Sequence, residues 1–266
     1  MIKDLKEKSK NLRRLIIMMT NRGNSSHVAS GLSCADILIS LYFSIMKIKN
    51  KYPMWKYRDR FILSKGHAGA AIYATLSLRG FFKEKILKTH YQNGSKLSGH
   101  VSHKGVKGVE FSTGSLGHGL SVGAGYALAL KRDKNFKSRV FCLLSDGELN
   151  EGSCWEAMLF ANHQKLDNLI MIIDRNKLQS IYSTEKTLKI EPLKDKIKSF
   201  GWTVRECNGH DHQKIINCIT KKYSAPLCVI ANTTKGKGVS FMENNNLWHY
   251  KSPQKEFYLK ALKELE

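Results

Sequence analysis

Asp146 and Asn176 are the side chains whose types and spacing are best suited to binding a hard metal ion. Asp146 comes directly after the apolar run RVFCLLS (139–145), and Asn176 comes two residues after NLIMIID (168–174). Their separation allows one helical crossover between neighbouring parallel strands, so both would lie at the same sheet edge. Mg²⁺ prefers such carboxylate and amide oxygens and completes its octahedron with phosphate oxygens, water or a carbonyl. The spacing therefore predicts a magnesium site facing a diphosphate.

Gly147 strengthens this interpretation because it places no side chain beside Asp146. Backbone N–H groups at the start of the following helix can then approach an anion. Asp-Gly and Asn-Lys are also common turn sequences, so either half alone carries little weight. The hypothesis depends on the two halves occurring together.

The elements that must position these residues alternate between strand and helix in the second half of the chain. We expect strands at 139–145, 168–174, 201–207 and 226–234, with helices at 153–165, 192–200 and 212–223 between them. We expect further helices at 2–20, at 33–47 and from residue 121, and a mixture of short helices and glycine-rich loops over 51–110.

Continuous apolar strands indicate burial on both faces, which is typical of a parallel sheet flanked by helices. We find no segment of linker composition, so we predict one α/β domain over residues 1–266. Ligands of such sheets bind at the carboxyl ends of the strands. The polar clusters SDGELNEG, DRNKLQ and TTKGKG fall at those ends.

Composition excludes several classes of protein. The 266 residues are 42% hydrophobic and 25% charged, which excludes global disorder, and no apolar run is long enough to cross a bilayer. The net charge of +22 comes mainly from scattered lysines, whereas nucleic-acid recognition favours clustered arginine, so we expect no nucleic-acid partner. Six cysteines without a CxxC motif, and no signal peptide, indicate buried free thiols in a cytoplasmic protein.

Longer sequence motifs carry more specific information than the Asp146 and Asn176 pair. The segments DRFILSKGHAGAAIYA, SGHVSHKGVKGVEFSTGSLGHGLSVGAGYALA, SDGELNEGSCWEA, DRNKLQ, FGWTVRECNGHD, TTKGKGVSFMEN and WHY occur in this order. Together they resemble the transketolases, a family of thiamine-diphosphate enzymes, over essentially the whole chain.

The resemblance implies the thiamine-diphosphate-binding fold and an amino-terminal subunit of a split transketolase. The pyrimidine-binding and carboxyl-terminal domains of the family are absent from residues 1–266. It implies a carboxyl-terminal partner subunit with the pyrimidine domain, two copies of each subunit, and the cofactors thiamine diphosphate and Mg²⁺. It also implies a transferase of carbohydrate metabolism, such as the pentose phosphate pathway, that moves a two-carbon ketol unit from a ketose to an aldose, free or phosphorylated. The alternatives are a related carboligase with a different donor, or a cofactor-binding assembly subunit without turnover.

Site residues follow from the same resemblance, position by position. The implied metal ligands are Asp146, Asn176 and the carbonyl of Leu178. The implied cofactor-binding residues are His67, Gly114, Ser115, Leu116, Gly147, Glu148, Asn176 and His249. The implied catalytic residues are His27, His100 and His249, with Glu151 as a carboxylate at the interface with the partner.

The remaining histidines receive other assignments. His90, His163 and His212 fit no motif, and we assign no role to His103 or His118. His210, in NGHD, is interpreted as part of a structural turn. The sequence departs from the family pattern around the substrate channel, for example where Tyr250 follows His249 in place of a usual glycine. These departures leave the sugar unidentified.

Overall fold

The computed structural model describes residues 1–135 and 137–266. Its centre is a sheet of five strands in the order β1-β2-β3-β5-β4, in which every neighbouring pair is parallel. The strands are β1 (Arg60–Leu63), β2 (Val140–Ser145), β3 (Leu169–Arg175), β4 (Thr203–Asn208) and β5 (Leu227–Asn232). The predicted α/β class with a parallel sheet is confirmed.

Helices cover both faces of this sheet. The α-helices are α1 (Ile2–Gly23), α2 (Val28–Ser33), α3 (Ala35–Ser40), α4 (Gly69–Leu78), α5 (Gly119–Arg132), α6 (Gly152–His163), α7 (Thr184–Thr187), α8 (Leu193–Ser199), α9 (His212–Thr220) and α10 (Lys255–Glu264). Short 3₁₀ or π segments are η1 (Leu41–Ile45), η2 (Gly66–Ala68), η3 (Glu84–Thr89), η4 (Gly147–Asn150) and η5 (Asn246–His249).

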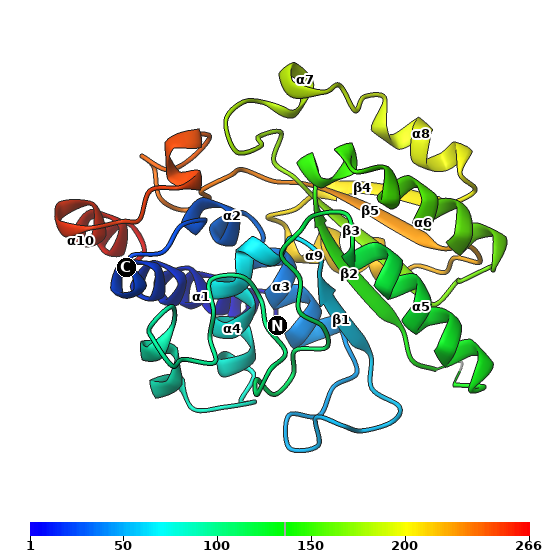
Figure 1. Cartoon of the computed structure of the whole chain (residues 1–266), viewed down its shortest axis with the longest axis horizontal. Helices are drawn as coiled ribbons and strands as arrows, with labels where there is room; N and C mark the ends of the chain where they lie inside the picture. Colours follow the sequence, from blue (N-terminus) through cyan, green and yellow to red (C-terminus); the bar gives the residue numbers. More distant parts are fainter. Residues whose placement is uncertain (136) are drawn as a thin grey trace.

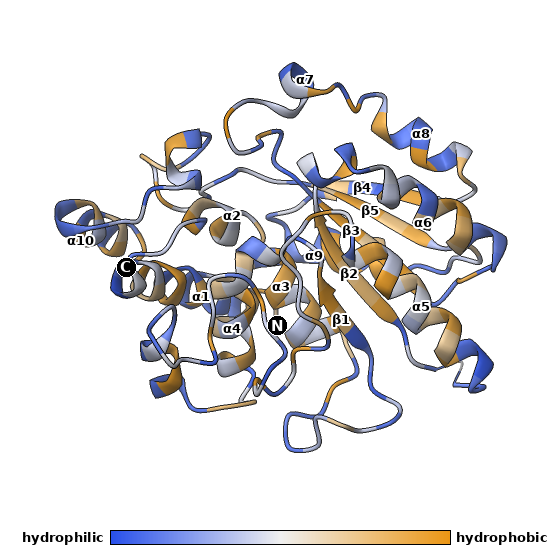
Figure 2. Cartoon of the chain, viewed as in Figure 1, coloured by the Kyte–Doolittle hydropathy of each residue, from blue (hydrophilic) through white to orange (hydrophobic). Residues whose placement is uncertain are grey.

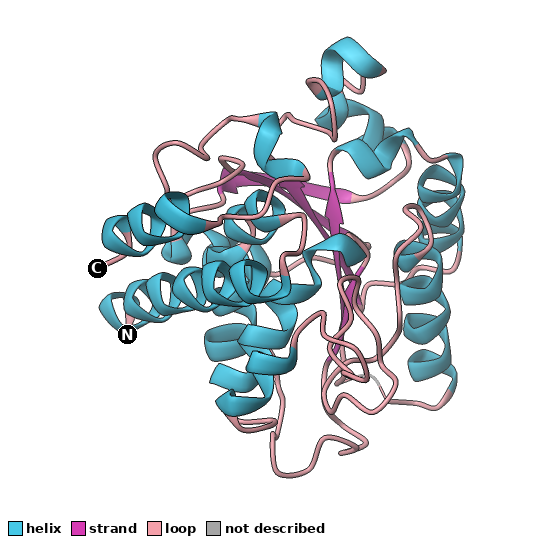
Figure 3. Ribbon diagram, turned by 60° about the vertical axis from the view of Figure 1, so that its left-hand side comes forward, coloured by secondary structure: helices cyan, strands magenta, loops and turns pink. Residues whose placement is uncertain are grey.

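The strands alternate their side chains between two apolar layers. Phe141 and Ile170 pack toward α1, α3, α4 and α9, whereas Cys142 and Met171 pack toward α5, α6 and α8. Figures 1 and 3 show the sheet between these helical layers, and Figure 2 shows the strands as its most hydrophobic part. Burial on both faces is confirmed for β2, β3 and β5, but β4 is only partly buried because it forms the edge of the sheet.

Two local expectations were wrong. Strand β1 lies in the region where we expected only short helices and loops, because RFIL is too short to give a recognisable period. The helix expected over 33–47 is divided into α3 and η1 and is preceded directly by α2. His27 directly precedes α2 as its N-cap, and its φ of 68° is left-handed, so the chain turns sharply there.

Three other features are visible around the core. Helices α1 and α10 pack together, and the Arg14 side chain donates to the carbonyl of Leu265 at 3.2 Å, so the C-terminal segment lies against α1 (Figure 1). All six cysteines are free thiols, and all except the half-buried Cys218 are buried. None of the helices in the described part of the chain is long and apolar enough to span a membrane.

Candidate functional site

A cavity of about 290 Å³ lies at the carboxyl edge of the sheet. Residues that follow four of the five strands meet there: Lys65 and His67 after β1, Ser145 and Gly147 after β2, Asn176 and Leu178 after β3, and Lys235 after β5. The other residues that line the cavity are His27, Ser30, His100, Gly114, Leu116, Gln179, Ser180, His249 and Tyr250. This is the position at which open parallel sheets bind ligands.

Asp146 and Asn176 lie on adjoining loops. Strands β2 and β3 are paired neighbours, with Ser145 opposite Asp174, so the two side chains leave the sheet side by side. The Asp146 Oδ2 accepts a hydrogen bond of 2.5 Å from the Lys177 N–H, and the Asn176 Oδ1 accepts one of 3.1 Å from the Leu178 N–H. The fold therefore brings the two predicted oxygen ligands to one place, with Asp146 fully buried between the lining residues Ser145 and Gly147.

The oxygen donors fit a magnesium ion better than a zinc ion. Asp146, the Asn176 amide and the Leu178 carbonyl are hard ligands from two adjoining loops. No cluster of three His, Cys, Asp or Glu residues suited to a metal occurs within residues 1–135 and 137–266. Gly147 has no space for a side chain, because a Cβ there would lie 2.8 Å from the Gln179 Cγ. Gly147 lines the cavity, and its N–H donates to the Asp146 Oδ1 at 2.8 Å.

Arg175 holds the Asp146 carboxylate from the side opposite the cavity. Its guanidinium donates to the Asp146 Oδ2 at 3.1 Å, to Glu185 at 3.0 Å and to Glu191 at 2.8 Å. Burial and the nearby Asp174 raise the pKa of Asp146 to about 6, whereas Arg175 opposes this rise. The loop after β2 is thereby tied to the segment that carries α7, a connection that the sequence did not suggest.

A fully buried ion pair lies beside the cavity. The Lys65 Nζ is 2.5 Å from the Asp174 Oδ2, and both side chains have no exposed surface. Lys65 also donates to the Ser30 carbonyl at 3.0 Å, and Asp174 accepts hydrogen bonds from the hydroxyls of Ser33 and Thr233. Burial alone would lower the pKa of Lys65, but Asp174 outweighs it and raises that pKa. Lys65 therefore stays positively charged.

Lys235 brings a second ammonium group to the cavity wall. Its Nζ lies 2.6 Å from the Gln179 carbonyl oxygen and 3.1 Å from the His249 Nδ1, and the residue is 1% exposed. Burial and the neighbouring Lys65 lower the pKa of Lys235 to about 8. Lys65 is compensated by Asp174, whereas the Lys235 ammonium contacts the neutral Gln179 carbonyl and His249 ring, so Lys235 is the cation that can attract an anion. Sequence reasoning missed both, although Lys65 stands in SKGH and Lys235 in TTKGKG.

The four histidines singled out by the resemblance form one cluster. The His27 ring centroid lies 5.2 Å from that of His67, 5.5 Å from that of His100 and 4.8 Å from that of His249. The left-handed turn at His27 and its backbone hydrogen bond of 2.7 Å to the His249 carbonyl bring α2 and η5 together. The His27 Nδ1 is buried and has no hydrogen-bond partner among residues 1–135 and 137–266, so it is available to a ligand in the cavity.

Three histidines of this cluster are neutral near pH 7. Burial, His100, Lys235 and Lys65 lower the pKa of His27 to about 4. Burial, Lys235 and His27 lower the pKa of His249 to about 3, and burial and Lys65 lower that of His67 as well. Because the His249 Nδ1 accepts from the Lys235 ammonium, the proton of its neutral ring is on Nε2. Lysines carry the positive charge of the site.

We expect the free energy of unfolding to decrease as the pH falls from about 6.5 toward 4. The unfolded chain protonates these histidines near 6.5, whereas the folded chain does so near 4 or 3 for His27 and His249, so protons favour unfolding in this interval. Asp146 and Glu148, whose pKa values are raised, act in the opposite direction but are fewer than the histidines whose pKa is lowered. Urea unfolding without cofactor at pH 7.5, 6 and 5 measures the slope.

A matched pair of variants isolates the contribution of the cluster. His249→Gln should make the dependence on pH less steep, whereas His163→Gln should leave it unchanged because His163 is exposed. Equal slopes for the wild type and His249→Gln would contradict the assignment of a depressed pKa to His249.

The other predicted site residues differ in their placement. Gly114 and Leu116 line the cavity, whereas Ser115 is exposed between them. Glu151 is exposed at the start of α6, beside Gly117.

The Glu148 carboxylate does not line the cavity as expected for a cofactor-binding side chain. It is buried and accepts hydrogen bonds from Ser64, from the Gly117 N–H at 2.9 Å and from the Ser145 N–H at 3.2 Å. The Glu148 side chain thus holds three loops together.

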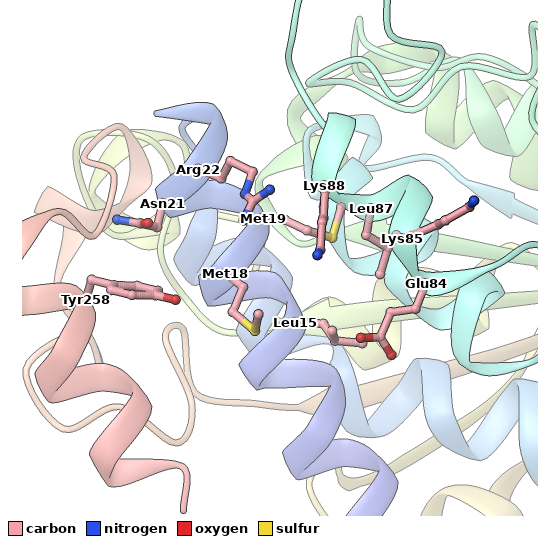
Figure 4. Close-up of a pocket in the computed structure, with 10 residues that line it drawn as sticks. All are labelled: Leu15, Met18, Met19, Asn21, Arg22, Glu84, Lys85, Leu87, Lys88 and Tyr258. Atoms are coloured by element: carbon pink, nitrogen blue, oxygen red, sulfur yellow. The ribbon is translucent and has the colours of Figure 1, made fainter.

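A second hollow, of about 250 Å³, lies on the outer side of α1 between η3 and α10. Figure 4 shows Leu15, Met18, Met19 and Tyr258 around it, with the charged ends of Arg22, Lys85 and Lys88 at its rim. Its charged residues are exposed, and it lies away from the carboxyl edge of the sheet. The first cavity is therefore the candidate active site.

Residues 5–264 match the family described as transketolase, thiamine diphosphate binding domain. The chain belongs to the transketolase family. It is 41% identical to a subunit of the apulose-4-phosphate transketolase of Phocaeicola vulgatus, over 99% of this chain and 94% of that protein. It is 37% identical to the 6-deoxy-6-sulfo-D-fructose transketolase subunit SqwG of a Clostridium species, over 99% of this chain and 96% of that protein.

Solved transketolases have the same fold. The transketolase of Campylobacter jejuni superimposes with a TM-score of 0.90 at 33% identity, over 98% of this chain and 43% of that protein. This transketolase chain thus spans about two fifths of the length of such proteins, whereas it spans nearly all of the relatives named as subunits. The identification as an amino-terminal subunit of a split transketolase, and hence as a transketolase-type transferase subunit, is confirmed.

Proposed function

We propose that this chain binds the diphosphate and magnesium half of thiamine diphosphate and transfers a ketol unit only together with a pyrimidine-domain subunit. The observation that supports this most directly is that Asn176 and Lys235 line one cavity at the carboxyl edge of the sheet, with Asp146 buried between the lining residues Ser145 and Gly147. Two oxygen side chains suit the cation, and Lys235 suits the anion that the cation would bridge.

The residues that would hold the cofactor have distinct tasks. Asp146, Asn176 and the Leu178 carbonyl would bind Mg²⁺, and the main chain at Gly147 would meet the diphosphate. Lys235, which contacts the Gln179 carbonyl, would donate to a phosphate oxygen. When bound, the cofactor supplies the nucleophilic carbon and the electron sink for cleaving the bond beside a ketose carbonyl.

The histidines would bind hydroxyl groups and move a proton. The unpartnered Nδ1 of His27 is an acceptor for a sugar hydroxyl or, in the other tautomer, a donor to it. The His249 Nε2 carries the proton, so it donates to an oxygen of the substrate. Because their pKa values lie below 7, both rings are uncharged at neutral pH. The His27 Nδ1 is the nitrogen that could accept a proton, since the His249 Nδ1 already accepts from Lys235. His67 and His100 complete the polar wall.

The mouth of the cavity carries an apolar rim that we assign to the partner subunit. Five large hydrophobic side chains, each at least 58% exposed, come from two segments that touch through a hydrogen bond of 2.6 Å between the Asn246 amide and the Ile181 carbonyl. The rim consists of Ile181, Tyr182, Leu188, Leu247 and Tyr250. Exposed apolar side chains concentrated beside a site mark a protein interface. Glu151 lies near the same edge and would face the partner as well.

Ile181→Asp is expected to weaken binding of the partner subunit by at least about tenfold, because burying a carboxylate in an apolar contact is unfavourable. Met54→Asp is the matched control. Met54 is 85% exposed, but it lies in the loop before β1, at the opposite edge of the sheet from α7 (Figure 1). Sedimentation or calorimetric titration of the two subunits measures the effect. Equal losses for both variants would move the interface elsewhere.

We propose a ketose phosphate as the donor, with apulose 4-phosphate as the first compound to test. The support is the 41% and 42% identity to subunits of two apulose-4-phosphate transketolases, together with the atypical wall residue Tyr250. The Tyr250 ring stands 4.8 Å from the His249 ring and 6.0 Å from the His27 ring, so it narrows the entrance. A panel with 6-deoxy-6-sulfofructose and unbranched ketose phosphates compares the candidates.

The deciding experiment combines the two subunits with Mg²⁺ and thiamine diphosphate and follows transfer of a two-carbon unit from each ketose to an aldose. Activity should require both subunits and should disappear with EDTA. Full activity of this chain alone would contradict the division of the site. A complex that binds the cofactor but transfers no ketol unit from any ketose would favour a carboligase with another donor.

A further inference from the structure

We propose that His210, in the NGHD motif, is a positioning residue that holds Lys235 at the diphosphate site. This inference rests on the proposed function, because it assigns a task to His210 through the lysine that would meet the cofactor. The sequence predicted only a structural turn for this motif. The His210 ring instead connects a buried ion pair to the segment from which Lys235 projects.

Two hydrogen bonds define the environment of the His210 ring. Its Nδ1 lies 2.8 Å from the Asp36 Oδ2, and its Nε2 accepts a hydrogen bond of 2.8 Å from the Thr234 N–H. Since a backbone N–H can only donate, Nε2 has no proton and the ring is the neutral Nδ1–H tautomer. A charged or flipped ring would place an N–H or C–H group opposite the Thr234 N–H, and the hydrogen bond would be lost. The ring state and the position of Thr234 are thus linked.

Asp36 is itself fixed by a second partner. The Arg13 guanidinium donates to both oxygens of Asp36, at 3.1 and 2.5 Å, in a buried bidentate pair. Burial would raise the pKa of Asp36, but His210 and Arg13 outweigh it and hold that pKa well below its usual range. A permanently ionised carboxylate keeps the proton of His210 on Nδ1. The chain Arg13–Asp36–His210 therefore presents a rigid acceptor to Thr234.

The segment 233–236 is held at each residue around Lys235. The Thr233 hydroxyl donates to Asp174, Thr234 donates to His210, and the Gly236 N–H donates to the Ala29 carbonyl at 3.0 Å. Gly236 has a φ of 79°, and a Cβ there would clash with the carbonyl oxygen of Met242. Thr234 directly precedes Lys235 in sequence, and its backbone N–H donates to the side chain of His210. Removing this hydrogen bond should let the ammonium of Lys235 move away from the cavity.

Two substitutions separate the two hydrogen bonds of the ring. A glutamine places its amide oxygen about where the Nε2 of histidine lies, so H210Q keeps an acceptor for Thr234. An asparagine places its amide nitrogen about where Nδ1 lies, so H210N keeps a donor for Asp36 and loses the acceptor. H210N is expected to raise the dissociation constant of thiamine diphosphate about tenfold in the reconstituted complex, and H210Q to change it less than about threefold.

Hydrogen exchange of the Thr234 amide provides a readout that does not depend on the cofactor. It should accelerate in H210N and stay slow in H210Q. The control is His212→Asn, because His212 lies in the same buried cluster but its ring bonds to Ser9 and Ser40. That variant should lower the melting temperature without changing the dissociation constant.

Each result of this design decides the inference. Selective weakening by H210N, with fast exchange at Thr234, supports it. Equal dissociation constants for H210N and H210Q overturn it, as does a wild-type affinity in H210N, while the proposed function stands. If the wild-type complex binds no thiamine diphosphate at all, the proposed function fails and the task assigned to His210 fails with it.

Discussion

Asp146→Ala is expected to abolish magnesium-dependent binding of thiamine diphosphate to the complex of this chain with its partner subunit. Asp146 is the one carboxylate among the proposed ligands, so its removal takes away the main charge that attracts the cation. Altering groups outside the ligand set of a metal typically costs 10–100-fold in affinity, and removing a ligand should cost at least about 100-fold. Calorimetric titration of the cofactor with and without Mg²⁺ measures the loss.

The variant should remain folded, because Arg175 keeps Glu185 and Glu191 as partners after Asp146 is removed. Glu185→Gln is the matched control, since it removes one partner of Arg175 without touching a proposed metal ligand. It should bind the cofactor nearly as the wild type does. Unchanged magnesium dependence in Asp146→Ala would place the cation elsewhere. Loss of the partner subunit in the same variant would show an assembly role for this loop.

Lys65→Met is expected to destabilise the folded chain by about 3–5 kcal/mol, because it leaves the Asp174 carboxylate buried without its ammonium partner. Both side chains have no exposed surface, so water cannot take the place of the lost charge. Urea unfolding measures the difference in the free energy of unfolding. Lys237→Met is the control, since Lys237 pairs with Glu243 at 3.1 Å at a half-exposed position, where an ion pair is worth at most about 1 kcal/mol.

A double variant tests the reason for this loss. Lys65→Met with Asp174→Asn removes both charges. Ser33 and Thr233 donate to different oxygens of Asp174, so the asparagine oxygen accepts from one hydroxyl while its amide group can donate to the oxygen of the other. The double variant should recover most of the stability lost in the single variant, because no uncompensated charge remains. If the double variant is as unstable as Lys65→Met, the loss comes from packing rather than from the buried charge.

The parts of the fold that sequence could predict are those with a long repeating pattern. Strands β2, β3 and β5 are apolar runs buried on both faces, and their loops contain Asp146, Asn176 and Lys235. The separation of Asp146 and Asn176, which allows one helical crossover, predicted that β2 and β3 are neighbours in the sheet. Strand β1 was missed because four residues carry too little pattern, and with it the link from Lys65 to Asp174 was missed.

The parts of the site that could not be predicted depend on contacts between distant segments. Glu148 stands beside Asp146 and Gly147 in sequence, yet its carboxylate turns toward Ser64 and Gly117 because those loops leave three donors around it. Arg175 lies beside the loop after β2 and donates to Glu185 and Glu191. Neither arrangement has a local signal, since the partners come together only when the sheet has formed.

The left-handed backbone at His27 implies that stability of the fold is given up at a residue proposed to bind substrate. For a residue with a Cβ, this conformation costs about 1–2 kcal/mol, and glycine or asparagine would adopt it more readily. A lineage screened only for thermal robustness would accordingly drift toward one of those residues. If His27 has the task proposed for it, its imidazole occupies a position at which the fold would be more stable with another residue.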